Sequence, residues 1–536
     1  MTTAPRPRRP SLLPLALVCI VVAYALPVSG LGWNQGSHYA LVRALADGTA
    51  RIDDDRFLTG DVSWDGEHFY STKAPGLALA TLPVYLVLDA TGARSALEGL
   101  GDSRREDARL VVWALGLWGV VLPAALLLIL VHRLGERLEP GSGGVAAAVL
   151  GAATLVLPFA TVFFAHVLSA LLGFAAFALL VRERSGLPRY RLVLAAGLLA
   201  GLAVTTEYTL LLVAVALGAY ALVRSDGRLQ RGLAYGIGTC VGVAPLVAYN
   251  WWAFGSPTRL SYEDAVLRPG ESGHDVLGAN TEGIFGVGVP DPRVAAELLF
   301  ASRGLLTTAP VLAVGLLGLV ILVHRGRRAE AILVGALAAA FLIFNAGYFL
   351  PLGGNTPGPR FLVPLLPFAA LAVGLAYRRL PGTTLALAAA SSVVLAAATF
   401  TFPLLPGGRT GEWADRIVAG EFRDTILTFA GVGAPWLAIL PAALALATAV
   451  VLAGRAFLPA VLERDDGRAG LAALAVWAVV AVALPRAGAD PGSGAAALVL
   501  AGAAAGVLVL AGIHAASLRR SQRPQPAADD GAAGSS

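Results

Sequence analysis

The chain has 536 residues, of which 57% are hydrophobic, and a formal net charge of +5. Its mean hydropathy of +0.71 and its long runs of Ala, Leu, Val and Gly exclude an ordinary soluble globular domain. In a membrane protein positive charge mainly reflects topology, so we expect no nucleic-acid partner. Cys19 and Cys240 both fall in apolar segments, which leaves no disulfide framework. We expect an all-α polytopic membrane protein.

The first apolar run covers residues 12–31 and follows Arg6, Arg8 and Arg9. Positive residues before an apolar run could indicate a secretory signal peptide. No small-residue cleavage site follows the run, so we expect a retained first membrane helix.

Apolar windows of about 20 residues predict about 14 transmembrane helices, within a range of 12–14. The expected spans are 11–31, 110–131, 143–163, 166–181, 192–206, 209–223, 232–252, 304–323, 329–350, 361–377, 383–403, 434–454, 469–485 and 495–513. Arginines collect in the short loops between alternate spans, which are 132–137, 182–191, 224–231, 324–328 and 378–379. The excess of Lys and Arg in cytoplasmic loops predicts that these loops and both termini face the cytoplasm.

The long connections of the chain all fall on the opposite side. Loops 32–109 and 253–303 are expected to be extracytoplasmic and to carry function, because cytoplasmic connectors are short. We divide the chain into a core over 1–380, additional C-terminal helices over 381–518, and a disordered cytoplasmic tail over 519–536 that is rich in Ala, Pro, Ser and Asp.

Two segments of the first long loop are predicted to be helices at the membrane surface. In segment 36–46, Tyr39, Val42 and Ala46 recur at helical spacing. The apolar segment 74–91 is interrupted by prolines, and counting it as a span would place the arginine-rich loops outside. We therefore expect it to be interfacial or re-entrant.

Acidic residues crowd the polar stretch between these two helices. Asp53 and Asp61 are candidate general bases, with Asp61 preferred because it is nearer to the apolar segment. His68 lies in the same stretch. Such carboxylates could also hold a divalent cation (Mg, Mn or Ca), or could form a solvated acidic loop without chemistry; the metal ligands stay unknown.

Three cations stand at or near the outer starts of apolar helices: Lys73, Arg303 and Arg360. Lys73 is the only lysine of the chain, and either base composition or a need for a compact ammonium would explain it. At a helix N-terminus a cation joins the free amides and the positive end of the dipole, which together suit a phosphate. The alternative is that these side chains are interfacial anchors.

His166 and Glu207 are polar residues at the outer ends of expected spans. Polar groups at such depth are costly unless they are paired or hydrated. They could contribute to substrate binding, or could be a satisfied interfacial histidine and an exposed turn carboxylate.

Over residues 10–380 the chain resembles the glycosyltransferase-C superfamily, in particular bacterial relatives of protein O-mannosyltransferases and of the aminoarabinose transferase of lipid A. The similarity follows the first span through Asn34 to Arg43, Tyr70 to Gly76, Phe254 to Pro257, Ser302 to Leu306, and Gly353-Gly354 followed by Gly358 to Phe361.

The resemblance implies an integral membrane glycosyltransferase that moves a sugar from a polyprenyl-phosphate donor to a hydroxyl of an envelope glycan, lipid or protein, with inversion at the anomeric carbon. It implies the bacterial plasma membrane and an extracytoplasmic active face. Asp61, with Asp53 behind it, would act as base; Lys73, Arg303 and Arg360 would bind the donor phosphate. His38, His68, His166 and Glu207 would bind substrate.

One departure from the family pattern concerns the base. Many relatives carry an acidic residue directly after the first span, where this chain has Asn34-Gln35, and His166 replaces a second acidic site of some relatives. The base has then moved, or the chain is a non-catalytic relative. The other alternative is a transporter or flippase for a lipid-linked or anionic solute, although ionisable residues concentrate at the outer ends of helices rather than deep within them.

Overall fold

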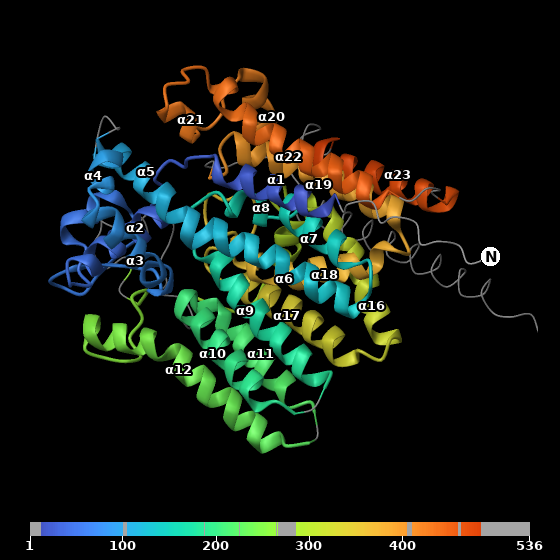
Figure 1. Cartoon of the computed structure of the whole chain (residues 1–536), viewed down its shortest axis with the longest axis horizontal. Helices are drawn as coiled ribbons and strands as arrows, with labels where there is room; N and C mark the ends of the chain where they lie inside the picture. The colour runs from blue at the N-terminus through green and yellow to red at the C-terminus, as the bar shows by residue number, and fades with distance from the viewer. Residues whose placement is uncertain are drawn as a thin grey trace, which may run out of the picture.

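The computed structural model describes residues 12–99, 104–186, 188–224, 226–263, 265, 286–404, 410–458 and 463–483. The described part is a bundle of helices (Figure 1), with one short hairpin. The expected span 495–513 and the tail 519–536 lie outside the described residues.

The helices and strands follow one another along the chain in this order: α1 Leu13–Ala25, α2 Trp33–Ala46, η1 Asp53–Leu58, β1 Val62–Trp64, β2 Phe69–Ser71, α3 Gly76–Ala90, α4 Ala93–Glu98, α5 Arg104–Gly116, η2 Leu117–Val121, α6 Leu122–Leu138, α7 Gly143–Ala152, α8 Val156–Phe159, α9 His166–Arg184, α10 Tyr190–Thr206, η3 Tyr208–Leu210, α11 Leu211–Ala221, α12 Arg228–Phe254, α14 Pro292–Phe300, α15 Leu305–Thr308, η4 Pro310–Val314, α16 Gly315–His324, α17 Arg328–Gly347, η5 Arg360–Leu365, α18 Leu366–Tyr377, α19 Pro381–Phe400, α20 Thr410–Ala419, α21 Ile426–Phe429, α22 Pro435–Phe457, α23 Arg464–Ala478 and η6 Val479–Ala483.

Seven helices in the described ranges are long and apolar enough to cross a membrane, and an eighth candidate is the bent pair Pro292–Thr308 and Pro310–His324, whose halves meet at 97°. Five shorter apolar helices accompany them. The expected count of about 14 is therefore not confirmed. One expected span, 143–163, breaks after Ala152 into α7 and the four-residue α8, and at 1.5 Å per residue neither piece is long enough to span a bilayer.

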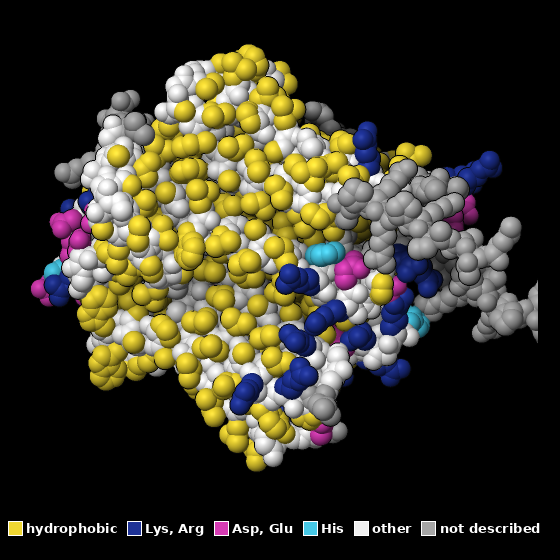
Figure 2. Space-filling view, in the orientation of Figure 1, with side chains coloured by type: hydrophobic (Ala, Val, Ile, Leu, Met, Phe, Trp, Pro, Cys, Tyr) yellow, Lys and Arg dark blue, Asp and Glu magenta, His cyan; other side chains and the backbone are white. Residues whose placement is uncertain are grey.

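Charge is unevenly distributed over the surface. Figure 2 shows apolar side chains across most of one face, with basic side chains gathered at its lower right and acidic ones at its left edge and, in smaller number, among the basic ones. An apolar face of this extent is typical of contact with lipid. The protein is a membrane protein whose charged side chains gather at the edges of this apolar face.

The first long loop forms a compact unit of α2, η1, the hairpin, α3 and α4 at the left of Figure 1. Both predicted surface helices exist, as α2 and α3. The expectation of an all-α fold missed the hairpin, in which β1 pairs antiparallel with β2 through Val62 with Ser71 and Trp64 with Phe69. Its strands have three residues each, too few for a period-2 pattern to stand out.

Helices after residue 380 pack on the start of the chain. The helices α1 and α22 run side by side (Figure 1), and the amide of Val28 donates to the carbonyl of Asp424 at 2.8 Å. The buried side chain of Arg423 donates to Ser29 and Thr161. The boundary at 380 stays a prediction, but the later helices contact the expected core directly.

Candidate active site

A cavity of about 470 Å³ lies where α2, the segment before α3, the start of α9, the end of α10 and η5 meet. Most of its lining is apolar, and its polar lining residues come from segments far apart in the sequence, among them Asn34, His38, Lys73, His166, Glu207 and Arg360. A largely apolar cavity with a few convergent polar groups is the usual form of a ligand site.

Lys73 points its ammonium at Asp61, with Nζ and Oδ2 2.8 Å apart. The two residues are only 9% and 8% exposed. The helix α2 holds both segments in place, because the Ser37 hydroxyl donates to the carbonyl of Asp61 at 2.8 Å and lies 2.8 Å from the Ser71 hydroxyl. Lys73 lines the cavity, so Asp61 positions a buried cation at its wall.

Burial, the largest effect, lowers the pKa of Lys73 below its usual value; Asp61 opposes this shift and Arg360 adds to it. His38 lines the same cavity from α2. Burial lowers the pKa of His38 well below its ordinary value, and the nearby charges of Lys73, His166 and Arg360 lower it further against the opposing effect of Asp61. Its imidazole is therefore neutral at physiological pH.

His166 and Glu207 form a buried pair. His166 Nδ1 lies 2.8 Å from Glu207 Oε1, the Ser169 hydroxyl donates to Oε2 at 2.8 Å and the Thr209 hydroxyl donates to Oε1 at 3.1 Å. Helix α10 ends at Thr206, and Glu207 adopts an extended backbone that turns its side chain toward the start of α9. The two expected substrate-binding residues are thus brought together at the cavity wall.

Arg360 begins η5 and lines the cavity. Its guanidinium carbon lies 4.9 Å from the ring centre of Phe361 and 5.8 Å from that of Phe164. The preceding loop turns through Gly353 and Gly354, whose φ values of 77° and 94° favour glycine. A side chain at Gly353 would also collide with the Arg360 side chain.

Arg303 is placed differently from the other two expected phosphate ligands. It does not line the cavity, and its Nη1 donates to the carbonyls of Gly354 and Thr356 at 3.1 and 3.2 Å. In this geometry Arg303 supports the loop that carries Arg360, and its expected role as a phosphate ligand stays a prediction.

Asp53 and His68 also lie outside the cavity lining. Asp53 Oδ2 is 2.9 Å from His68 Nδ1, and Asp53 Oδ1 accepts from the Phe69 amide at 2.8 Å. Asp55 is paired with Arg43 at 2.8 Å. The described residues contain no group of three or more His, Cys, Asp or Glu arranged to hold a metal, so the divalent cation stays a prediction and no step below depends on it.

Four residues of the cavity wall each keep a buried polar atom without a hydrogen-bond partner among the described residues: Asn34 Oδ1, His38 Nδ1, His166 Nε2 and Arg360 Nε. Unsatisfied buried polar atoms are costly. Four of them around one cavity indicate a wall built to meet a polar ligand.

Sequence reasoning missed two features of this wall. Asn34 was noted only as the absence of an acid, yet it lines the cavity. Tyr348 donates to the hydroxyl of Tyr262 at 2.9 Å, and both rings face the cavity; burial raises the pKa of Tyr262 to about 12. The aromatic content of the loops was the available signal, but the two residues are 86 positions apart.

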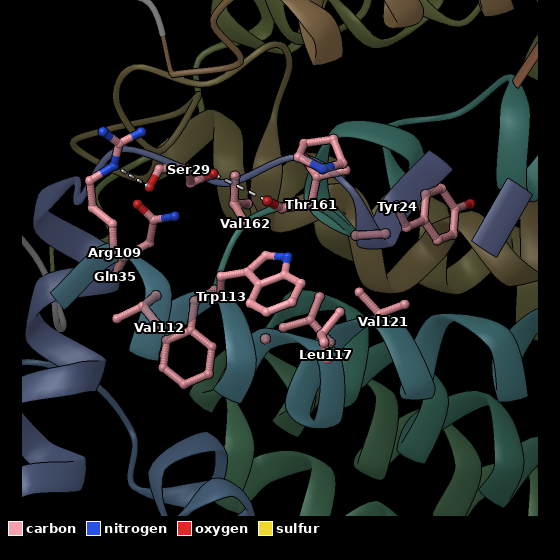
Figure 3. Close-up of a pocket in the computed structure, with 15 residues that line it drawn as sticks. Tyr24, Ser29, Gln35, Arg109, Val112, Trp113, Leu117, Val121, Thr161 and Val162 are labelled. Atoms are coloured by element: carbon pink, nitrogen blue, oxygen red, sulfur yellow. Dashed lines mark hydrogen bonds between the residues drawn. The ribbon is translucent and has the colours of Figure 1, made fainter. Parts of the chain in front are cut away.

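Gln35 belongs to a separate small pocket (Figure 3). There the Arg109 side chain donates to the Ser29 carbonyl and the Ser29 hydroxyl donates to the Thr161 carbonyl. The volume of this pocket, about 20 Å³, suits a water molecule rather than a substrate. Gln35 Oε1 accepts from the Gly32 amide at 2.9 Å, so this residue fixes the start of α2.

No family model and no curated protein matches the sequence. Among solved structures, ArnT from Cupriavidus metallidurans is 17% identical in both its apo form and its form bound to undecaprenyl phosphate. The matches cover 83% and 87% of this chain and 76% and 79% of ArnT, with TM-scores of 0.46 and 0.47.

The archaeal oligosaccharyltransferase AglB from Archaeoglobus fulgidus, in complex with an inhibitory peptide and a dolichol-phosphate, is 13% identical. The match covers 86% of this chain with a TM-score of 0.44, and the chain spans 59% of that protein. At such identities the chemistry must be argued from the residues of this chain.

Proposed function

We propose that the protein is a membrane glycosyltransferase of the glycosyltransferase-C type, which transfers a sugar from a polyprenyl-phosphate donor to a hydroxyl acceptor. The observation that carries the proposal is the cavity of about 470 Å³, whose apolar wall is interrupted by the cations Lys73 and Arg360 and by unsatisfied polar atoms of Asn34, His38 and His166 among the described residues. A lipid-linked phosphate sugar has matching parts: an apolar chain, an anion and a polar ring.

The cations account for binding of the donor. Lys73 supplies a compact point charge and Arg360 a planar set of donors, and both suit phosphate oxygens. A low-polarity cavity strengthens these interactions relative to water. The phenol pair of Tyr262 and Tyr348 supplies aromatic surface and hydroxyl groups for the sugar.

The proposed reaction is a single displacement. The acceptor oxygen attacks the anomeric carbon, the bond from that carbon to the phosphate oxygen breaks, and the configuration inverts. Negative charge develops on the departing polyprenyl phosphate, where Lys73 and Arg360 stabilise it. Asp61 favours the charged form of Lys73 and holds its ammonium at the cavity wall.

The proposed setting is the bacterial plasma membrane, with the cavity on the extracytoplasmic side. The gathering of basic side chains at one end of the apolar face supports this orientation. A hydroxyl of an envelope glycan, lipid or protein would then be the acceptor.

The test uses the full chain in liposomes with a panel of polyprenyl-phosphate-linked sugars and an envelope extract as acceptor. We expect release of polyprenyl phosphate that depends on acceptor and is lost in Lys73→Ala. Movement of the lipid across the bilayer without release would identify a flippase. Binding of undecaprenyl phosphate without either outcome would identify a non-catalytic binding protein.

A further inference from the structure

We propose that His166 is the general base of this site and that Glu207 is its positioning residue. The inference rests on the proposed function and deepens it by naming the group that takes the acceptor proton. It assigns the base to α9, rather than to the acidic stretch of the first loop where sequence reasoning expected it.

The partners of Glu207 bear on which nitrogen of His166 carries the proton. The Ser169 and Thr209 hydroxyls donate to the Glu207 carboxylate, and His166 Nδ1 lies 2.8 Å from its Oε1. An ionised carboxylate can only accept hydrogen bonds, so in the proposed arrangement Nδ1 carries the proton. His166 Nε2 then holds a lone pair, is buried, and has no partner among the described residues. Since His166 lines the cavity, a substrate hydroxyl can supply the missing donor.

The carboxylate also stabilises the product of proton transfer. When Nε2 takes a proton the ring becomes an imidazolium, and Glu207 at 2.8 Å compensates its charge. A carboxylate that orients a histidine and stabilises its charged form is an established arrangement for a general base. Phe159, Phe164 and Phe361 pack against the ring and limit its rotation.

The other titratable groups near the cavity are less suited to the role. Asp61 does not line the cavity, and its Oδ2 is held by the ammonium of Lys73. His38 has an unsatisfied Nδ1, but burial, followed by the charges of Lys73, His166 and Arg360, lowers its pKa well below the ordinary value. The amide of Asn34 accepts a hydrogen bond without taking a proton.

The charged and titratable groups that line the cavity with His166 come from several elements. They are Glu207 from the end of α10, His38 from α2, Lys73 (paired with Asp61) from the segment before α3, Arg360 from η5, and the phenols of Tyr208, Tyr262 and Tyr348. Among the described residues, Glu207 is the one that forms a hydrogen bond with the ring. It therefore sets the orientation of the ring.

The step balances without a further reactant. The acceptor oxygen forms a bond to the anomeric carbon while the carbon–oxygen bond to phosphate breaks and its electron pair leaves on the phosphate. The acceptor proton moves to His166 Nε2, and the imidazolium later releases it to water or to the departing phosphate.

The test compares the pH profiles of transfer for wild type, His166→Asn and Glu207→Gln, with His324→Asn as a matched control. His324 is exposed at the end of α16 and lies outside the cavity lining. A general base contributes about 10²–10⁴-fold to the rate, so His166→Asn should reduce kcat by that factor. It should also abolish the acid limb of the pH profile, which is the fall in rate at low pH. Its KM for the donor and its binding of undecaprenyl phosphate should change by less than about threefold.

Glu207→Gln should slow transfer and displace the acid limb, because the variant no longer places a carboxylate 2.8 Å from the imidazolium to compensate its charge. His324→Asn should leave the profile unchanged. A structural role for Glu207 would lower activity without moving the acid limb. If His166→Asn fails to fold, as judged by elution and melting temperature, the Glu207→Gln profile decides alone.

Two results would overturn the inference while the function survives. One is an unchanged acid limb in a folded His166→Asn variant. The other is a loss of undecaprenyl phosphate binding as large as the loss of kcat, which would make His166 a hydrogen-bond donor to the phosphate. A wild-type protein that transfers no sugar from any donor would instead remove the proposed function and the base with it.

Discussion

The ammonium of Lys73 and the carboxylate of Asp61 form an ion pair of 2.8 Å inside the protein, at the wall of a cavity large enough for a ligand. A buried pair of this kind adds little stability over apolar residues, but loss of one partner leaves an uncompensated charge. Its placement beside the cavity favours a role in binding.

Two substitutions of Lys73 should show whether transfer requires only a positive charge at this position or the compact shape of an ammonium group. Lys73→Ala should reduce transfer by about 100-fold or more, since it removes the charge that we propose stabilises the leaving phosphate. Lys73→Arg keeps the charge but should still lose about 10-fold, because a planar guanidinium does not fit the site of a compact ammonium. Steady-state rates in liposomes measure both.

Arg94→Lys is the matched control for this cation exchange. Arg94 pairs with Asp89 and Glu98 in the same loop, away from the cavity lining. Surface pairs contribute about 0–1 kcal/mol, so its rate should equal that of wild type. Full activity in Lys73→Arg would show that position 73 requires only a positive charge.

Binding of undecaprenyl phosphate should weaken with rising pH as Lys73 loses its proton. Because burial, the largest effect, lowers the pKa of Lys73, this decline should occur at lower pH than for an exposed lysine. Asp61 raises that pKa and Arg360 lowers it. The midpoint should therefore move to lower pH in Asp61→Asn and to higher pH in Arg360→Gln, as measured by dissociation constants across a pH series.

These opposite shifts are the internal control of that experiment. Midpoints that coincide in all three proteins would show that Lys73 does not control the pH dependence of binding.

Loss of Arg303 should weaken the site indirectly. Arg303→Ala removes two charge-assisted hydrogen bonds to the carbonyls of Gly354 and Thr356, each worth about 1.5–3 kcal/mol. We expect a lower melting temperature and a higher KM for the donor, with kcat reduced less than in Arg360→Ala. Arg293→Ala, at the exposed start of α14, should match wild type. Equal effects of Arg303→Ala and Arg360→Ala on kcat would contradict a purely supporting role.

Gly76 should tolerate no side chain. A Cβ there would lie 2.5 Å from the Cα of Thr206 and 2.7 Å from its amide nitrogen, so α3 and α10 would have to separate near Lys73 and Glu207. Overpacking of this kind costs about 1–3 kcal/mol, and Gly76→Ala should lower both the melting temperature and transfer. In Gly116→Ala the added methyl group meets no atom within 4 Å, so the melting temperature and the rate of transfer should stay unchanged. Equal losses in the two variants would refute the packing argument.

His38 should not set the pH dependence of transfer. Burial, as the main cause, and neighbouring cations hold the pKa of His38 well below its usual range, so His38 is already neutral where transfer is measured. His38→Gln should reduce the rate through its place in the cavity wall but leave the acid limb at the pH of wild type. A displaced limb in His38→Gln would identify this histidine as the titrating group.

The sequence predicted the parts of this protein that follow local rules. Helical spacing identified α2, and the alternation of apolar runs with arginine-rich loops identified most of the long helices. The sequence also predicted that Lys73, Arg360, His166 and Glu207 lie at outer ends of helices, and the structure brings these four residues to one cavity. Local patterns record hydropathy and charge, which determine where a segment lies relative to the membrane.

Partners across the fold were not predictable in the same way. His166 and Glu207 are 41 residues apart, and the Arg303 contacts span more than 50. Nothing in the local pattern distinguishes Arg303, which donates to loop carbonyls, from Arg360, which faces the cavity. The break of span 143–163 depends on tertiary packing, since all residues of α7 are apolar or glycine and favour a longer helix on hydropathy alone.

The lining of the cavity begins at Asn34 and ends at Phe361, so the proposed lipid carrier could bind only after the chain has been synthesised through Phe361. The segment with Lys73 reaches the bilayer long before α17 and η5 have been made. A partly synthesised chain therefore has an incomplete cavity, and under the proposed function its first helices would be inserted among carrier lipids without binding them. Carrier binding would consequently report that a newly made chain has docked its helices through η5.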